Sequence, residues 1–251
     1  MFMRLVQVKV KPESSDKLAA LYAQQIVPEL QKTPGCIYAS LIQSSSNPDE
    51  SISLTLWETA HDADAYEQSG AFQRLITEAH PYFSDSSEWK IQLSKDLTLE
   101  YTPVSQEPVV RSYTETTPST DRPSLAEEGR LYIRILSVKV QSGKTEEFAK
   151  IYQSEILPVL RNVQGCRYAF LTEGVEERNE VISLTIWDSK EAADVYESSG
   201  LFRKLTRKVQ HTFSELFQWK MAAERRSNVQ VTTTEDLSVK GYHVVSGKTF
   251  Q

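Results

Sequence analysis

The chain has no long apolar stretch. No run approaches the roughly 18 apolar residues that a membrane-spanning helix needs. The first residues, MFMRLVQVKV, place no extended apolar segment after a basic one, as a secretion signal would. We therefore expect a cytoplasmic protein with no membrane partner.

Cysteine is also scarce, with only Cys36 and Cys166 in 251 residues. The two occupy equivalent positions of a repeat, so a disulfide would have to join the copies, and we expect two free thiols. Each follows a glycine and precedes an apolar stretch, where a small thiol commonly fills space; a catalytic or metal role is the alternative. The histidines fall at no metal spacing, and we expect no metal. They are His61, His80, His211 and His243.

Basic residues are outnumbered, since 28 Lys and Arg stand against 34 Asp and Glu, and they form no cluster. A nucleic-acid partner is therefore not expected. Residues 1–113 are net acidic and residues 129–251 net basic, which either favours docking of the two parts or reflects drift of exposed surfaces. The composition, 39% hydrophobic and 25% charged, is that of a globular protein.

The chain contains a long internal repeat. Its segment Ile52 to Phe72, ISLTLWETAHDADAYEQSGAF, returns at Ile182 to Phe202 as ISLTIWDSKEAADVYESSGLF. Trp57 and Trp187 are 187 − 57 = 130 residues apart. This period far exceeds the 20 to 50 residues of solenoid repeats, so each copy should be a domain.

Each copy is expected to run β-α-β-β-α-α-β. Alternation of apolar residues predicts strands, and apolar residues at helical spacing predict helices. A proline late in the first helix, Pro28 or Pro158, predicts a kink or break there. In the first copy we expect strands over 4–11, 36–42, 52–58 and 88–94, and helices over 18–30, 60–68 and 72–83.

The fold class predicted is α+β, with two tandem ferredoxin-like units. Apolar residues occur on both sides of several strands, such as Leu54 and Leu56 against Trp57, so the sheets should be buried on both faces. The simplest cover for one sheet is the sheet of the other copy. We therefore expect the antiparallel sheets to pack face to face as an intrachain dimeric α+β barrel, with further homo-oligomers left open.

Each unit is followed by an arm in which apolar and polar residues alternate. VRSY, ending at Tyr113, is echoed by VKGY, ending at Tyr242, and such arms are expected to cross to the other unit and seal a sheet edge. The domains expected are 1–113 and 129–245, each including its arm, with a linker at 114–128 and a loose tail at 246–251.

Two motifs, PGCIYASL followed by SLTLWETAHDADAYEQSGAF, and their repeats QGCRYAFL and SLTIWDSKEAADVYESSGLF, resemble the antibiotic biosynthesis monooxygenase domain of the dimeric α+β barrel superfamily. The resemblance covers residues 3–94 and 133–222. It implies a pocket between helices and sheet, in which some members oxygenate aromatic polyketide-like or quinol substrates without metal or flavin. Other members degrade haem.

The haem-degrading members use an asparagine on the first strand, a tryptophan in the helix after the third strand and a histidine ligand in the next helix. Tyr66 and Ile76 match the last two positions in the first copy, and Tyr196 and Thr206 match them in the second. Neither first strand has an asparagine, and Ile76 has no lone pair for iron. Haem chemistry is therefore disfavoured, although His80 lies one helical turn after Ile76.

The resemblance makes Tyr66 and Tyr196 the catalytic candidates, acting on a phenol or quinol. The packing alternative is that these tyrosines point their hydroxyls to the surface and that the tryptophans anchor the core. No repeated histidine or inward carboxylate offers a general base. The residues expected to line a substrate pocket are Gln7, Ser53, Thr55, Trp57, His80, Ser137, Ser183, Thr185 and Trp187.

Two kinds of function remain open at this stage. The first is a cofactor-independent monooxygenase that acts on a small aromatic or quinol-like molecule. The second is a non-catalytic small-molecule-binding or structural module with the same barrel, with haem binding or degradation as a third alternative. In each of the first two, the partner expected is a small apolar or aromatic molecule and no cofactor is required.

Overall fold

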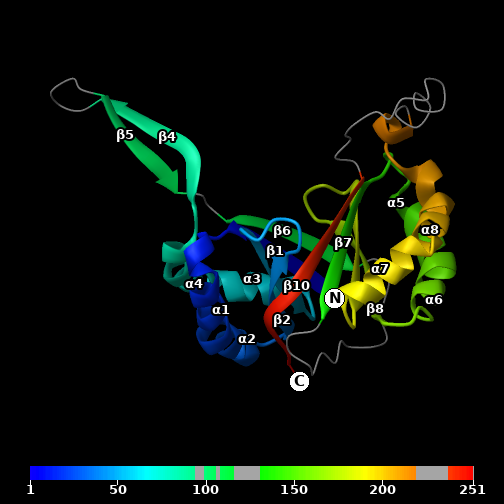
Figure 1. Cartoon of the computed structure of the whole chain (residues 1–251), viewed down its shortest axis with the longest axis horizontal. Coiled ribbons are helices and arrows are strands. Elements are labelled where there is room, and N and C mark those ends of the chain that lie inside the picture. Colours follow the sequence, from blue (N-terminus) through cyan, green and yellow to red (C-terminus); the bar gives the residue numbers. More distant parts are fainter. Residues whose placement is uncertain (94–98, 106–107, 116–130, 219–236, 251) are drawn as a thin grey trace.

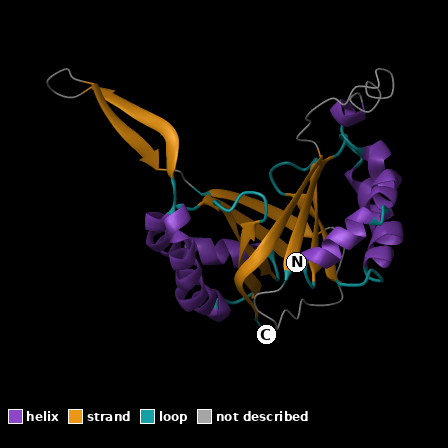
Figure 2. Ribbon diagram, viewed as in Figure 1, coloured by secondary structure: helices purple, strands orange, loops and turns teal. Residues whose placement is uncertain are grey.

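Eight strands form a closed barrel, and the helices of the two copies cover opposite sides of it (Figures 1 and 2). The computed structural model describes residues 1–93, 99–105, 108–115, 131–218 and 237–250. The two copies lie in one barrel within a single chain, as the repeat predicts. None of the described helices is long and apolar enough to cross a membrane.

The two copies have the same order of elements. The first consists of β1 (Phe2–Lys9), α1 (Ser15–Leu21), α2 (Val27–Lys32), β2 (Cys36–Ser44), β3 (Glu50–Trp57), α3 (Ala60–Gln68) and α4 (Ala71–Ala79). The second consists of β7 (Tyr132–Lys139), α5 (Thr145–Ile151), α6 (Leu157–Leu160), β8 (Cys166–Gly174), β9 (Glu180–Trp187), α7 (Lys190–Ser198) and α8 (Leu201–Val209).

The first helix of each copy widens where the sequence predicts a kink. A π-helical turn, Tyr22–Ile26, joins α1 to α2, and Tyr152–Ile156 joins α5 to α6. Pro28 lies in the first turn of α2, directly after the π-helical turn. Because proline has no N–H to donate to the preceding turn, the wider π-helical turn accommodates it and the helix does not end there. The helix therefore stays continuous, and Tyr22 begins the widened turn.

The arms close the barrel. β6 (Val109–Glu115) pairs with β1 of its own copy and β8 of the other, and β10 (Leu237–Thr249) pairs with β7 and β2. The strand order around the barrel is β1-β3-β2-β10-β7-β9-β8-β6. The expected exchange of arms between the copies is confirmed, and no barrel strand keeps an unpaired edge.

The last strand expected in the first unit does not belong to the barrel. β4 (Asp85–Leu93) pairs with β5 (Leu99–Ser105) in a separate two-stranded sheet that projects away from the barrel (Figure 1). The free edge of β1 is taken by β6, where Val6 is opposite Val110, so no barrel position is left for β4. The corresponding strand of the second copy, around Trp219, lies outside the described residues.

The loose tail expected at 246–251 also differs in the structure. β10 continues through Thr249, and its residues 246–249 pair with Leu41 through Tyr38 of β2 after an irregularity between Val244 and Ser246. Pairing here satisfies the backbone groups of an edge that would otherwise be open.

The core has three parts because strands such as β1 are buried on both faces. On β1, Met3 and Leu5 join the cluster inside the barrel, while Val6, Val8 and Val10 join the cluster beneath the first copy's helices. A third cluster lies beneath the helices of the second copy. Full burial of one large apolar side chain contributes about 1.5 to 3 kcal/mol, so the two faces together provide most of the stabilisation.

Candidate functional site

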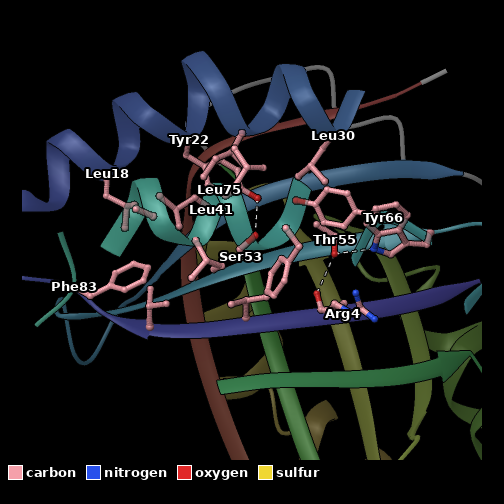
Figure 3. A pocket seen from close by; sticks show the side chains of 17 residues that line it. Arg4, Leu18, Tyr22, Leu30, Leu41, Ser53, Thr55, Tyr66, Leu75 and Phe83 are labelled. Carbon is pink, nitrogen blue, oxygen red and sulfur yellow. Dashed lines mark hydrogen bonds between the residues drawn. The ribbon is translucent and has the colours of Figure 1, made fainter. Parts of the chain in front are cut away.

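A small cavity lies between the helices of the first copy and the outer face of its strands (Figure 3). Its volume is about 60 Å³. Most of its wall is aliphatic or aromatic, with Leu18 and Leu30 from the helices and Val6 and Val8 from β1. The polar side chains that reach it come from β1, β3, the π-helical turn and α3, and they are Arg4, Ser53, Thr55, Tyr22 and Tyr66.

Tyr22 and Ser53 form a partly buried hydrogen bond at one side of the cavity. Their hydroxyl oxygens lie 2.9 Å apart (Figure 3). The widened turn carries Tyr22 on the side of the helix that faces β3, and Tyr22 is 1% exposed. Burial raises the pKa of Tyr22 well above its ordinary value, so this pair is neutral at physiological pH.

Trp57 is held by a short chain of hydrogen bonds. Its Nε1 donates to Thr55 Oγ1 at 2.9 Å, and Thr55 Oγ1 donates to the backbone oxygen of Arg4 at 3.4 Å (Figure 3). Trp57 is fully buried and lines the cavity with its ring. Because its only polar atom is already bonded, Trp57 acts here as a wall and a core anchor.

Tyr66 presents a hydroxyl that no protein group uses among the described residues. It lies on α3, whose start is fixed by a capping box between Thr59 and Asp62. Its ring packs 5.3 Å from Trp57 and edge-on to Phe72 at 6.1 Å. Tyr66 is 7% exposed, and burial raises the pKa of its hydroxyl far above the ordinary value. The hydroxyl is therefore a neutral donor within the cavity.

Arg4 is a buried cation at the cavity that the sequence reasoning overlooked. It is 5% exposed, and its Nη1 donates to the backbone oxygen of Ala63 at 3.2 Å. Asp64 and Glu67, both more than half exposed, accept from the two Nη atoms at 3.3 and 3.2 Å. Arg4 Nε is buried and has no hydrogen-bond partner in the part of the chain that the structure describes. A buried donor left unpaired costs free energy unless a ligand or water accepts from it.

The second copy repeats this arrangement in a smaller space. Tyr152 lies 2.9 Å from Ser183, Trp187 Nε1 donates to Thr185 Oγ1 at 2.8 Å, and Arg134 pairs with Glu197 at 3.0 Å. Its cavity measures about 40 Å³.

Four lining positions differ between the copies: Val209 replaces Ala79 and is larger, Thr206 replaces Ile76 and is smaller, and the other two changes are also to larger side chains. Leu136 and Phe148 line the second cavity at the positions that Val6 and Leu18 occupy in the first. Both replacements are larger side chains, so they fill space that stays open in the first copy. Arg134 also stacks on Phe202, with its guanidinium carbon 5.0 Å from the ring centroid. The first cavity is therefore the more open of two equivalent sites.

The structure brings most of the expected pocket residues together. Ser53, Thr55, Trp57 and Tyr66 line the first cavity, and their counterparts Ser183, Thr185 and Tyr196 line the second. Trp187 is buried with its ring 5.0 Å from Tyr196, but it is not among the residues that line the second cavity.

Three of the expected residues lie elsewhere. Gln7 and Ser137 face the inside of the barrel, because alternation along β1 and β7 turns them away from the helices. His80 begins a 3-10 turn after α4, packs edge-on against Phe83 at 6.1 Å, and is not among the residues lining the cavity.

Cys36 is buried, Cys166 is partly buried, and both thiols are protonated. Burial raises the pKa of Cys36 and of Cys166 to about 12, so neither is a nucleophile at neutral pH. Both are free cysteines. Within the described residues, no three His, Cys, Asp or Glu side chains gather closely enough to hold a metal ion.

A repeated inward carboxylate exists, but it lies inside the barrel. Glu50 and Glu180 are 9% and 8% exposed at the first positions of β3 and β9. The alternation that turns Ile52 and Leu54 into the barrel includes Glu50, so the signal was present in the sequence. The expectation that no carboxylate turns inward was wrong.

Residues 1–78 and 131–208 match the sequence model of a family described as antibiotic biosynthesis monooxygenase. No curated protein matches the chain. A proposed monooxygenase from Fusobacterium nucleatum is similar in fold, with TM-score 0.63, 9% identity, and coverage of 99% of this chain and 94% of that one.

Two further structures are similar over the whole chain. A proposed monooxygenase from Lactobacillus acidophilus has TM-score 0.61 at 8% identity and covers 99% of this chain and 95% of its own. An anthrone oxidase-like protein has TM-score 0.55 at 13% identity, and the match covers 99% of this chain and 92% of that one. At identities of 8 to 13%, the similarity to these three structures shows a shared fold alone.

Proposed function

Because the chain belongs to the antibiotic biosynthesis monooxygenase family, we propose that it is a cofactor-independent monooxygenase acting on a small aromatic or quinol-like molecule. The site is the cavity of the first copy. One observation carries the proposal: among the described residues, neither Arg4 Nε nor the Tyr66 hydroxyl has a hydrogen-bond partner, and both groups belong to residues that line a mostly apolar cavity. An aromatic ligand with an oxygen atom fits that combination.

The two donors favour the anionic form of such a substrate. Arg4 is permanently charged, and Tyr66 stays protonated because burial raises its pKa. Hydrogen bonds from both groups to one phenolic or keto oxygen would stabilise negative charge that develops when the substrate loses a proton. The apolar wall strengthens this effect, since few other dipoles screen it.

The reaction balances without a cofactor because the substrate supplies the electrons. A CH₂ that lies between two aromatic rings and across the same ring from a ketone loses a proton, and the resulting carbanion reduces O₂. Overall, CH₂ and O₂ give C=O and H₂O, so one oxygen atom enters the product and the other leaves as water. The anthrone oxidase-like protein of similar fold suggests this substrate type.

Proton removal is the step to which the cavity contributes least. No carboxylate or histidine is among its lining residues, and Asp64 and Glu67 are engaged by Arg4 on its solvent side. We therefore expect substrates that are acidic enough to ionise to water once their anion is stabilised. Anthrones and quinols meet that condition, whereas unactivated aromatic rings do not.

Access to the site requires side-chain movement. A cavity of about 60 Å³ is smaller than the roughly 150 Å³ that accommodates benzene in a protein core. Phe72 and Ile76 of α4 are only partly buried at its edge, so they are the side chains expected to move. Haem is far larger than this space, and Ile76 offers it no ligand atom.

A non-catalytic role is the second candidate, and one observation favours it for the second copy. Leu136 and Phe148 reduce that cavity while the hydrogen bonds around it are kept. We propose that the second copy mainly completes the barrel.

Oxygen uptake with anthrone and with a substituted quinol tests the proposal. Wild type should consume O₂, and the variant combining Tyr66→Phe and Tyr196→Phe should lose most of this turnover. Tyr82→Phe, at a partly buried tyrosine outside the cavity lining, is the matched control. Unchanged turnover in the double variant would remove the tyrosines from the mechanism.

A further inference from the structure

A much larger cavity, of about 680 Å³, lies on the other face of the sheet, at the mouth of the barrel. Gln7 and Ser137, which are 137 − 7 = 130 residues apart, both line it, so the two copies share this space. Its volume falls within the range of about 300 to 1,000 Å³ typical of small-molecule sites. The helix-covered pockets and this cavity are separated by the sheet itself.

The deep wall of this cavity is apolar. Leu5, Ile52, Ile135 and Ile182 line it, and all four are at most 7% exposed. They belong to the core cluster inside the barrel. A ligand that reaches this wall would therefore bury apolar surface, at about 25 cal/mol per Å².

The polar groups midway into the cavity are almost all engaged with one another. Glu180 accepts from Ser137 Oγ at 2.7 Å and from the Tyr113 hydroxyl at 3.4 Å. This carboxylate is thus already satisfied and would repel a second negative charge at that depth. Gln7 is partly buried, and its carboxamide has no hydrogen-bond partner among the described residues.

The rim of this cavity carries two exposed cations. Arg111 and Lys139 are 57% and 42% exposed, and both line the cavity. Among the described residues, the carboxylate oxygens that pair with them, on Glu180 and Glu177, lie 3.9 Å away in each case, which is longer than a hydrogen bond. Arg111 also donates one hydrogen bond to the Tyr113 hydroxyl, which leaves its other N–H groups free. Both cations therefore retain N–H groups for an anionic oxygen from a ligand.

We infer that the barrel mouth is a second binding site, for a small amphipathic organic anion. Its apolar body would lie against the isoleucines, its middle would meet the Gln7 carboxamide, and its acidic group would bind Arg111 and Lys139 at the rim. From the deep end to the rim, the cavity presents an apolar wall, then the hydrogen-bonded carboxylate of Glu180, then the two cations. This order sets the orientation of the ligand, because the acidic group of the ligand is favoured only at the rim. The site does not depend on oxygenation in the helix-covered pocket.

Titration with 1-anilinonaphthalene-8-sulfonate, an aromatic sulfonate, locates the site in the unmodified protein. The δ1-methyl NMR signals of Ile52, Ile135 and Ile182 report on the barrel mouth, whereas those of Ile26 and Ile76 report on the helix-covered pocket. We expect the first three signals to shift on titration and the other two to stay. Shifts confined to Ile26 and Ile76, or no shifts, would overturn the inference.

A charge variant tests the rim. Lys139→Gln should weaken binding of the sulfonate by about five- to tenfold, as expected for the loss of one charge-assisted contact. Lys204→Gln is the matched control, because Lys204 is exposed on α8 and distant from the cavity lining. Equal affinity in wild type and Lys139→Gln would contradict the orientation and with it the proposed class of ligand.

Discussion

Tyr242 of the second copy's arm donates a hydrogen bond to Glu50 of the first copy, with its hydroxyl 3.0 Å from Oε1. Lys240 Nζ lies 3.1 Å from the same oxygen. In the other half, Tyr113 reaches Glu180 of the second copy. Each arm thus supplies a hydrogen-bond partner for a buried carboxylate of the opposite copy, so these contacts tie the two copies together in the closed barrel.

Removal of one such contact should destabilise the whole barrel. Tyr242→Phe leaves Glu50 buried with one partner fewer, and we expect a loss of about 1 to 3 kcal/mol in the free energy of unfolding. Urea denaturation measures it, with Tyr82→Phe as the control. If Tyr242→Phe unfolds at the same urea concentration as wild type, the contact does not stabilise the closed barrel.

Alanine substitutions at two glycines with the same backbone conformation distinguish the cost of backbone strain from the cost of a steric clash. Gly35 and Gly70 have φ of 76° and 77°, but a Cβ on Gly35 would lie 2.3 Å from Asp62 Cγ, whereas one on Gly70 would meet nothing within 4 Å. Gly70→Ala should cost about 1 to 2 kcal/mol from strain alone.

Gly35→Ala should cost more, about 2 to 4 kcal/mol, because it also displaces Asp62 from the capping box of α3. Thermal unfolding of the two variants side by side measures the difference. Equal melting temperatures would show that Asp62 moves aside without cost.

Stability should fall at alkaline pH. Burial raises the pKa of the Cys36 and Cys166 thiols from 9.0 to about 12, so above pH 9 the unfolded chain loses these protons while the folded chain keeps them. The contribution is complete below pH 9 and is lost as the pH rises towards 12. Within that window each thiol lowers the unfolding free energy by about 1.4 kcal/mol per pH unit.

Urea denaturation at pH 8, 9, 10 and 10.5 checks this dependence. The variant combining Cys36→Ala and Cys166→Ala should show a shallower decline over the same pH range. If the unfolding free energy declines identically in the two proteins, the decline is due to other groups. Tyr113 is one such group, because burial also raises its pKa to about 12.

The repeat made the architecture predictable, because the offset of 130 residues identifies two equal units and the arms that follow them. The position of β4 was not predictable, since the alternation of Trp89 and Ile91 indicates a strand but not its neighbour. The arm was expected to seal an edge, yet which edge it takes depends on long-range pairing, here Val6 with Val110.

The candidate site was predicted in part. Ser53, Thr55 and Tyr66 follow from the resemblance and the strand pattern. Arg4 was overlooked because an arginine beside a strand's start is ordinarily exposed, and only the packing of α3 over it explains its burial. Gln7 was misassigned because a pattern of alternation gives two faces without saying which one the helices cover.

Arg4→Lys tests the role of the unpaired Nε. Lysine keeps the positive charge and can still pair with Asp64 and Glu67, but it has no donor at the position of Nε. We expect the protein to remain folded while kcat for anthrone oxidation falls about 10- to 100-fold. Circular dichroism provides the control for folding, and an unchanged kcat would mean that Nε does not contact the reacting molecule.

The most direct measurement is the incorporation of ¹⁸O from ¹⁸O₂ into the oxidised product of anthrone, compared between Tyr66→Phe and Tyr196→Phe. The account predicts one labelled oxygen per product with wild type, a rate at least about tenfold lower in Tyr66→Phe, and a nearly normal rate in Tyr196→Phe. Absence of enzyme-dependent label, or a loss of rate confined to Tyr196→Phe, would contradict a monooxygenase site in the first copy.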